Sequence, residues 1–428
     1  MLRRAALVAV AAFGCTQAQL PTPPARPVVK PAAASRAVDH ANEAIDALVG
    51  GDYAGVVNAF APDSNPPTLS QVESAWRTQA AGLGEYRSWS QVDRTFQDGF
   101  EVRILHIELE RGTVQCLVSV DPGSLELRSL FITRPAQLPS YIDRAQIRDV
   151  AVTFGTPALD ATLTLPSGKG PFPAVVLVHG SGPNDRNNAV GATKIFKDLA
   201  EGLASSGIAV LRYDKRTYTY REQLDNSITL DDEVVLDAVA AVKLLAARTD
   251  VDASRVFVIG HSLGGLLAPE IAVRAGDVAG IALLAPPGRV PWDIVRDQMR
   301  YLGAPRDTLI DTEKAVIELN VGVETGRLAG MPYSYWRDWA SRDGVAMVKR
   351  FARPTLILHG TRDYQVTDED FAVWQRGLRD ESHVELVTVT GANHLFIAGQ
   401  GQPTPLEYKV EAHVDARVIA KLVAFVTR

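Results

Sequence analysis

The stretch of the chain that decides the fold is Arg255-Val256-Phe257-Val258-Ile259-Gly260-His261-Ser262-Leu263-Gly264-Gly265. It opens with an apolar run typical of a buried strand and passes into a second apolar segment, residues 263–275, typical of a helix. Between the two stands Gly-x-Ser-x-Gly, whose small residues let the backbone turn sharply and lift the serine side chain clear of the sheet edge. This order predicts that Ser262 is an exposed nucleophile.

The chain also offers the two partners that a nucleophilic serine requires. A serine hydroxyl attacks poorly at neutral pH unless a histidine takes its proton and an acid orients that histidine. His394 follows an expected strand at 384–389, and Asp363 follows another at 355–358. Loops at the carboxyl ends of parallel strands are active-site positions. We therefore expect Ser262, Asp363 and His394 to form a catalytic triad.

A pair of backbone N–H groups is expected to stabilise the negative charge that develops on the substrate oxygen. The first is that of Leu263, directly after the proposed nucleophile. The second belongs to Ser181 or Gly182, in the small-residue turn His179-Gly180-Ser181-Gly182-Pro183 that follows the expected strand 174–178.

Strand-like and helix-like segments alternate from about residue 146 to residue 428. This pattern predicts a mostly parallel sheet with helices on both faces. The alternation is interrupted between about residues 286 and 350, where we expect a lid insertion. The insertion is rich in large side chains: Trp292, Met299, Tyr301, Tyr333, Tyr335, Trp336 and Trp339.

Residues 38–135 predict a separate small α+β domain. Helical spacing from Val38 to Phe60 is broken at Gly50-Gly51, and alternating segments at 100–110, 113–121 and 125–133 indicate antiparallel strands. With Gly51-Asp52-Tyr53 between its helices, this unit resembles the small domains of nuclear-transport-factor-2 type that precede some bacterial hydrolase domains. We expect a packing partner rather than a ligand-binding module, although the sequence allows either.

The first residues predict export. Met1-Leu2-Arg3-Arg4 and the apolar run that follows are typical of a signal peptide, expected over residues 1–18, with a Pro/Ala-rich linker over 19–37. The protein is thus expected in the periplasm or outside the cell. Cys15 leaves open a lipid anchor, and because the chain has only one other cysteine, Cys116, an anchored or cleaved protein cannot form an intramolecular disulfide.

Composition and motifs exclude several classes of function. The net charge of -6 and the 22% of charged residues are ordinary for a globular protein, so we expect no nucleic-acid partner. The glycine-rich turns lack the spacing of nucleotide-binding loops, and His, Cys and carboxylate residues lack metal-ligand spacing. We expect no cofactor and no metal, and the sequence leaves the oligomeric state open.

Residues 146–428 resemble an α/β-hydrolase of the bacterial serine esterase type, related to the dienelactone-hydrolase and prolyl-oligopeptidase-like groups. The similarity is most specific in residues 179–186, His-Gly-Ser-Gly-Pro-Asn-Asp-Arg, and in Gly-Ile-Ala-Val-Leu-Arg-Tyr-Asp-Lys-Arg at 207–216. It implies hydrolysis of a carboxylic ester through an acyl-enzyme. From the order of the triad and the aromatic-rich insertion, which could wall an acyl pocket, we expect a small-molecule ester of small or medium acyl chain. A peptidase or thioesterase on the same fold, and a non-catalytic envelope binding module, stay open as alternatives.

Overall fold

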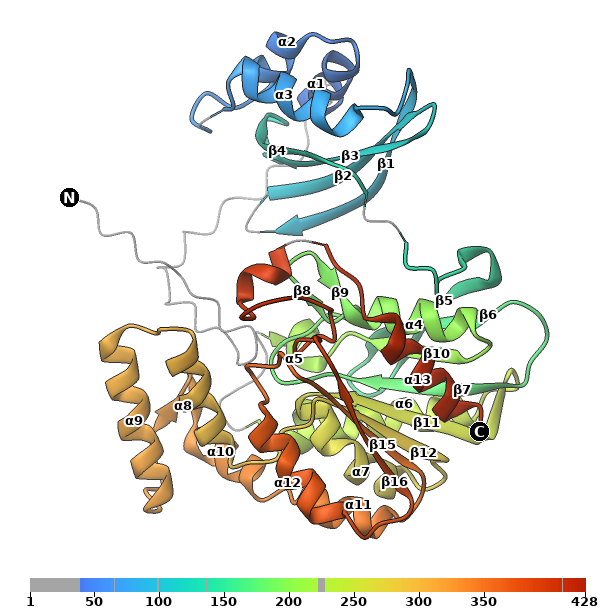
Figure 1. The fold of residues 1–428 in the computed structure, drawn as a ribbon, viewed down its shortest axis with the longest axis vertical. Coiled ribbons are helices and arrows are strands. Elements are labelled where there is room, and N and C mark those ends of the chain that lie inside the picture. Colours follow the sequence, from blue (N-terminus) through green and yellow to red (C-terminus); the bar gives the residue numbers. More distant parts are fainter. Residues whose placement is uncertain (1–38, 65, 98–99, 136–137, 222–227, 410) are drawn as a thin grey trace. The chain divides into compact units, whose positions relative to one another are not determined.

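The computed structural model describes residues 39–64, 66–97, 100–135, 138–221, 228–409 and 411–428. They fall into two compact units, divided between Gln137 and Leu138 (Figure 1). The expected signal peptide, the linker and Cys15 lie outside the described residues.

The amino-terminal unit has three helices packed on one face of a four-stranded antiparallel sheet of order β1-β2-β3-β4 (Figure 1). This confirms the small α+β domain, and the predicted break at Gly50-Gly51 separates the first two helices. The elements are α1 (His40–Val49), α2 (Tyr53–Asn58), α3 (Leu69–Ala80), β1 (Tyr86–Gln97), β2 (Phe100–Leu109), β3 (Gly112–Val120) and β4 (Leu127–Thr133). Cys116 lies in the core of this unit, where burial raises the pKa of its thiol to about 12.

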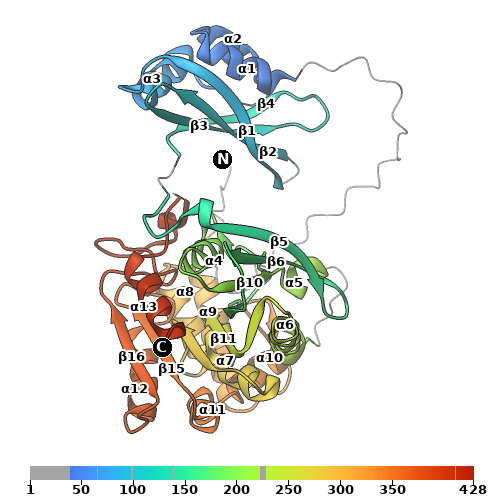
Figure 2. The same cartoon turned by 90° about the vertical axis from the view of Figure 1, so that its right-hand side faces the viewer.

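The second unit is built on an eight-stranded sheet of order β16-β15-β12-β11-β7-β10-β6-β5. Figure 2 shows β16 and the pair β5 and β6 at opposite ends of this sheet. The six strands from β16 to β10 run parallel, whereas β6 pairs antiparallel with both of its neighbours. The strands are β5 (Ile147–Phe154), β6 (Leu159–Pro166), β7 (Phe172–Val178), β10 (Ala209–Tyr213), β11 (Val251–His261), β12 (Gly280–Leu284), β15 (Thr355–Gly360) and β16 (Val384–Val389).

Alternate residues of the parallel strands contribute to two separate cores, because successive side chains of a strand point to opposite faces of the sheet. Val175 and Leu177 pack with α4 (Ile195–Ser205) and α13 (Ala416–Val426). Val176 and Val178 contribute to the core on the other face. That core also contains side chains of α6 (Leu236–Ala246), α7 (Leu263–Ala275), α11 (Gly344–Phe351) and α12 (Asp368–Leu378). Helices therefore cover both faces, which confirms the predicted fold class.

The segment expected to form a lid is helical. Its elements are α8 (Pro291–Tyr301), α9 (Arg306–Asn320), a short hairpin of β13 (Arg327–Leu328) and β14 (Met331–Pro332), α10 (Tyr333–Ala340) and α11, which packs on α7. Figure 1 shows α8 and α9 side by side. Most of the large side chains here are buried in the core that continues from α7. The exception is Tyr301, which is 37% exposed and stacks on Tyr364 with 4.6 Å between ring centroids.

Several elements had no clear signal in the sequence. They are α3, β1, β5 and β6, the small hairpin β8 (Ala189–Val190) and β9 (Thr193–Lys194), the short helices η1 (Arg144–Gln146), α5 (Arg216–Thr219) and η4 (Pro405–Lys409), and a π-helical turn, η3 (Asp231–Val235). The edge strand β1 is polar and largely exposed, and half of the residues of the edge strand β5 are exposed, so the apolar pattern that reveals a core strand is weak in both. In the part of the chain that the structure describes, no helix is both long and apolar enough to span a membrane.

Candidate active site

Ser262 occupies a strained turn between β11 and α7, with φ 55° and ψ -121°. The expectation that it is exposed was wrong: the residue is only 8% exposed, because it lines a cavity between loops. Its N–H donates to the carbonyl of Leu284 on β12, at 2.8 Å, which fixes the turn against the neighbouring strand. The glycines of the motif are required by close packing of the backbone. A Cβ at Gly260 would lie 2.1 Å from the carbonyl oxygen of Gly264, and a Cβ at Gly264 would lie 2.4 Å from that of Val178.

His394 and Asp363, 31 residues apart in the chain, are in direct contact. Nδ1 of His394 lies 2.7 Å from Oδ2 of Asp363, and both side chains are almost fully buried. The other carboxylate oxygen of Asp363 accepts the backbone N–H groups of Gln365 and Val366, at 2.8 and 2.9 Å. A carboxylate can only accept from the imidazole, so the proton of His394 sits on Nδ1 and Nε2 is left as a base.

Ser262 and His394 line one small cavity, together with the turn after β7. The open space there, including the mouth, is about 360 Å³, and the wall is formed by Gly180, Ser181, Asn184, Asn188, Val190, His261, Ser262, Gln365, His394, Leu395 and Tyr408. Asp363 contacts the ring of His394 but is not itself one of the residues that line the cavity. The structure thus brings the three residues predicted as a triad to the carboxyl ends of β11, β15 and β16.

The residues predicted as oxyanion donors differ in position. Leu263 is the first residue of α7, and the first N–H groups of a helix have no partner within it. Ser181 lines the cavity, and the Cβ position of Gly180 beside it lies 3.6 Å from Oγ of Ser262. Gly182 is not among the described residues that line the cavity; it has φ +85°, and its carbonyl accepts from Thr217 and Asn184.

The cavity has a wall that the sequence did not indicate. Tyr408 belongs to η4, and Glu407 beside it accepts hydrogen bonds from Arg362 and from Nδ2 of Asn393, the latter at 2.9 Å. Arg362 also donates to the carbonyls of Gln400 and Gly401. Because Arg362 and Asn393 adjoin Asp363 and His394, the same short loops hold both the predicted catalytic groups and the wall.

Charged residues near the site form ion pairs. Arg186 pairs with Asp214, Arg212 with Asp149, and Arg216 with Asp237.

Two other aspartates close to Asp363 in the sequence could also orient a histidine, but they lie at the start of α12. Asp370 closes a capping box with Thr367, and Asp368 accepts from His359 at 2.7 Å. Neither is in contact with His394 in the hydrogen bonds described for that ring.

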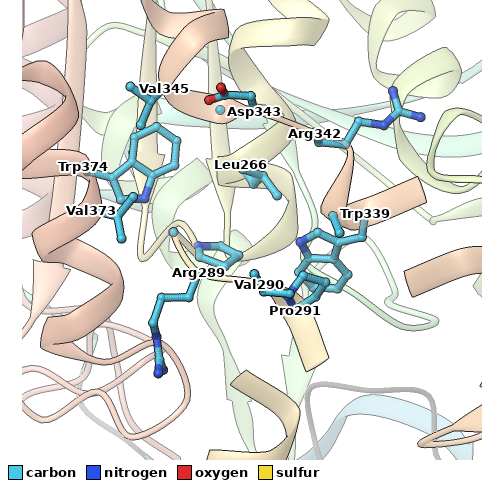
Figure 3. Close-up of a pocket in the computed structure, with 14 residues that line it drawn as sticks. Leu266, Arg289, Val290, Pro291, Trp339, Arg342, Asp343, Val345, Val373 and Trp374 are labelled. Carbon is cyan, nitrogen blue, oxygen red and sulfur yellow. The ribbon is translucent and has the colours of Figure 1, made fainter. Parts of the chain in front are cut away.

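A second hollow lies between the insertion and α12 (Figure 3), with about 690 Å³ of open space including its mouth. Trp339 and Trp374 flank it, with Leu266 between them. Its arginines, Arg289 and Arg342, are paired with carboxylates. None of the predicted site residues is among the residues lining it. Within the described residues, no group of three or more His, Cys, Asp or Glu side chains is placed to hold a metal ion.

Comparison with known proteins agrees with this architecture. The model of the alpha/beta hydrolase family matches residues 175–404. The chain belongs to the α/β-hydrolase family. Esterase EstD of Thermotoga maritima is 36% identical over 374 residues, which cover 84% of this chain and 88% of EstD.

Solved structures similar to this chain include an esterase of Pyrococcus furiosus, PF2001, at 18% identity and a TM-score of 0.43, covering 66% of this chain and 90% of that one. A puromycin-hydrolyzing peptidase of Mycobacterium tuberculosis has 20% identity and a TM-score of 0.46. The match covers 80% of this α/β-hydrolase and 47% of the peptidase.

Proposed function

We propose that this α/β-hydrolase is a serine carboxylesterase that cleaves esters of small acyl chain through an acyl-enzyme. The observation that supports this most directly is the buried contact of 2.7 Å between Nδ1 of His394 and Oδ2 of Asp363, with His394 and Ser262 lining the same cavity. The similarity to EstD, which is named an esterase, also supports an ester as the substrate of this protein.

In the proposed reaction, Oγ of Ser262 attacks the ester carbonyl carbon while its proton passes to Nε2 of His394. The carbonyl oxygen becomes negatively charged and is held by the N–H groups of Leu263 and Ser181. The C–O bond then breaks, and the alcohol leaves with the proton from His394. Water adds to the acyl-enzyme by the same steps, which releases the acid and restores Ser262.

The size and chemistry of the cavity favour a short acyl group. The cavity itself has room of only about 20 Å³, far below the roughly 300–1,000 Å³ of pockets that enclose drug-sized ligands. Asn184, Asn188 and Gln365 make much of the wall polar, and Tyr408 also lines it. The aromatic side chains of the insertion are mostly packed against one another, so they do not offer a long acyl channel.

The test is turnover of p-nitrophenyl esters from acetate to decanoate by the wild-type protein and by Ser262→Ala. We expect the highest kcat/KM at acetate to butyrate, and loss of nearly all turnover in the variant with an unchanged circular dichroism spectrum. Equal turnover by Ser262→Ala would overturn the assignment. Matched thioester and amide substrates decide between an esterase and a thioesterase or peptidase.

Labelling with a fluorophosphonate probe separates an enzyme from a binding module. We expect stoichiometric attachment at Ser262 under native conditions, and none in Ser262→Ala. An intact wild-type protein that stays unlabelled would favour a non-catalytic module.

We also propose that the protein acts outside the cytoplasm, as residues 1–18 suggest. Mass spectrometry of the mature protein from a bacterial host should find an amino terminus after Ala18, or a lipid on Cys15. A full-length protein that retains Met1 in the cytoplasm would contradict export.

A further inference from the structure

Lys215 is a buried cation next to the turn that is expected to bind the substrate oxygen. It follows β10, at the amino end of α5, and is 2% exposed. Burial lowers the pKa of its ammonium group, and the nearby carboxylate of Glu233 opposes this effect. A fully buried lysine is costly unless it is paired and hydrogen-bonded, so its contacts show what holds it there.

Two of the three contacts of Lys215 are made with the turn after β7. Its Nζ donates to the carbonyl oxygen of Gly180 at 2.7 Å and to that of Gly182 at 3.0 Å. The intervening carbonyl, that of Ser181, accepts from Nδ2 of Asn184 at 3.1 Å. Three successive carbonyls are therefore fixed by side chains outside the turn.

Fixing a carbonyl also fixes the N–H of the next residue, because a planar trans peptide holds the two groups in opposite directions. The carbonyl of Gly180 determines where the N–H of Ser181 points, and that of Ser181 determines the direction of the N–H of Gly182. Lys215 lies on the carbonyl side of the first of these peptides. Ser181 lines the cavity that contains Ser262.

The third contact of Lys215 is its buried ion pair with Glu233, in the π-helical turn η3. The second carboxylate oxygen of Glu233 accepts from the hydroxyl of Tyr335 at 2.8 Å. Tyr335 belongs to α10 in the insertion, so a chain of three buried side chains connects the insertion to the turn after β7.

From these contacts we propose that Lys215, with Glu233 as its counter-ion, is a positioning residue that aims the N–H of Ser181 at the substrate oxygen. The inference rests on the proposed ester hydrolysis. Lys215 does not touch the substrate; it acts through the carbonyl of Gly180. Without Lys215, the peptide groups of the turn can rotate, and the oxyanion that develops on the substrate then loses a hydrogen-bond donor.

The test is the double variant Lys215→Met/Glu233→Gln, which removes both charges together and avoids leaving a buried carboxylate alone. Arg216→Met/Asp237→Asn is a matched control, because it removes a neighbouring ion pair, between α5 and α6. The hydrogen bonds of Arg216 run to Asp237 and not to the turn.

We expect kcat for a short ester to fall about 100-fold in the double variant, as for a misplaced catalytic group, with KM changed less than about threefold. The rate of fluorophosphonate labelling should fall by a similar factor. In the control, both rates should stay within about twofold of wild type. Wild-type kcat and labelling in the double variant would overturn the proposal.

Amide hydrogen exchange of residues 179–186 measures the placement of the turn without reference to activity. We expect faster exchange in the double variant than in the control, and equal exchange in the two would overturn the proposal. A wild-type protein without esterase activity or fluorophosphonate labelling would overturn the proposed function instead.

Discussion

His261 donates a hydrogen bond of 2.9 Å from Nε2 to the main-chain carbonyl oxygen of His394, 133 residues further along the chain. The two rings are 4.7 Å apart between centroids. Burial lowers the pKa of His261 to about 3, so its ring is uncharged at neutral pH, with the proton on Nε2 and Nδ1 left as an acceptor. The residue before the proposed nucleophile thus fixes the loop of the proposed base.

Replacing His261 with Phe keeps an aromatic ring at this position but should weaken catalysis. The variant loses the bond to the carbonyl of His394, so we expect kcat for a short ester to fall about tenfold or more through misplacement of the base. His359→Phe is a suitable control, since it removes a histidine at the end of β15 that bonds to Asp368 instead. Equal kcat values for the two variants would contradict a role of His261 in placing His394.

Asp363→Asn should reduce kcat much more. An amide in place of the carboxylate favours the wrong tautomer of His394, an effect of about 10⁴ in kcat in a serine protease triad. Steady-state assays with a short ester measure this loss of kcat. Asp368→Asn, at the competing acid on the start of α12, should leave kcat within about threefold. The reverse ranking would assign the orienting acid to Asp368.

Arg289 should be important for stability. It pairs with Asp370, whose side chain is completely buried, and it borders the hollow in Figure 3. Arg289→Met removes the cation and leaves a buried carboxylate, a change that costs about 3–5 kcal/mol. Because backbone N–H groups of residues 288 and 289 still reach Asp370, we expect a value of about 3 kcal/mol from denaturant unfolding.

The matched control for Arg289→Met is Arg379→Met, because Arg379 and its partner Asp380 are both more than three-quarters exposed. An exposed pair is screened by water, so we expect little change in the free energy of unfolding. A loss in the control as large as in Arg289→Met would show that burial of the carboxylate is not the cause.

The pair of His413 and Asp198 should make stability depend on pH. The hydrogen bond from Nδ1 of His413 to Asp198, at 3.0 Å, raises the pKa of the imidazole, against the effect of burial. A raised pKa in the folded state means that folding favours the protonated ring. This stabilisation is complete below the ordinary value of about 6.5 and is lost as the pH rises through the raised value.

The measurement is the free energy of unfolding of wild type and His413→Gln at pH 5.5 and pH 9. We expect wild type to exceed the variant by more at pH 5.5 than at pH 9. A difference that grows toward pH 9 would have the wrong sign for a raised pKa.

The sequence alone predicted the strands and helices of the second unit whose side chains are buried. Its apolar runs marked β7, β11 and β16, and α7 was predicted with the bounds that the structure shows. It failed for β5, an edge strand with four exposed residues, and for β6, where Thr162 and Thr164 interrupt the apolar run although only Asp160 is exposed. An uninterrupted apolar run reveals a strand, whereas exposed or polar positions within a strand weaken that signal.

The sequence by itself determined the residue types and their order, Gly-x-Ser-x-Gly, then an acid, then a histidine, each after an apolar strand. Parallel strands end at one edge of a sheet, so this order was enough to place Ser262, Asp363 and His394 together. Only the tertiary structure decided what surrounds them: the donor from His261, the wall that Arg362 anchors, and the buried pair of Lys215 and Glu233. These contacts join segments far apart in the chain, and their geometry depends on side-chain packing that no local pattern records.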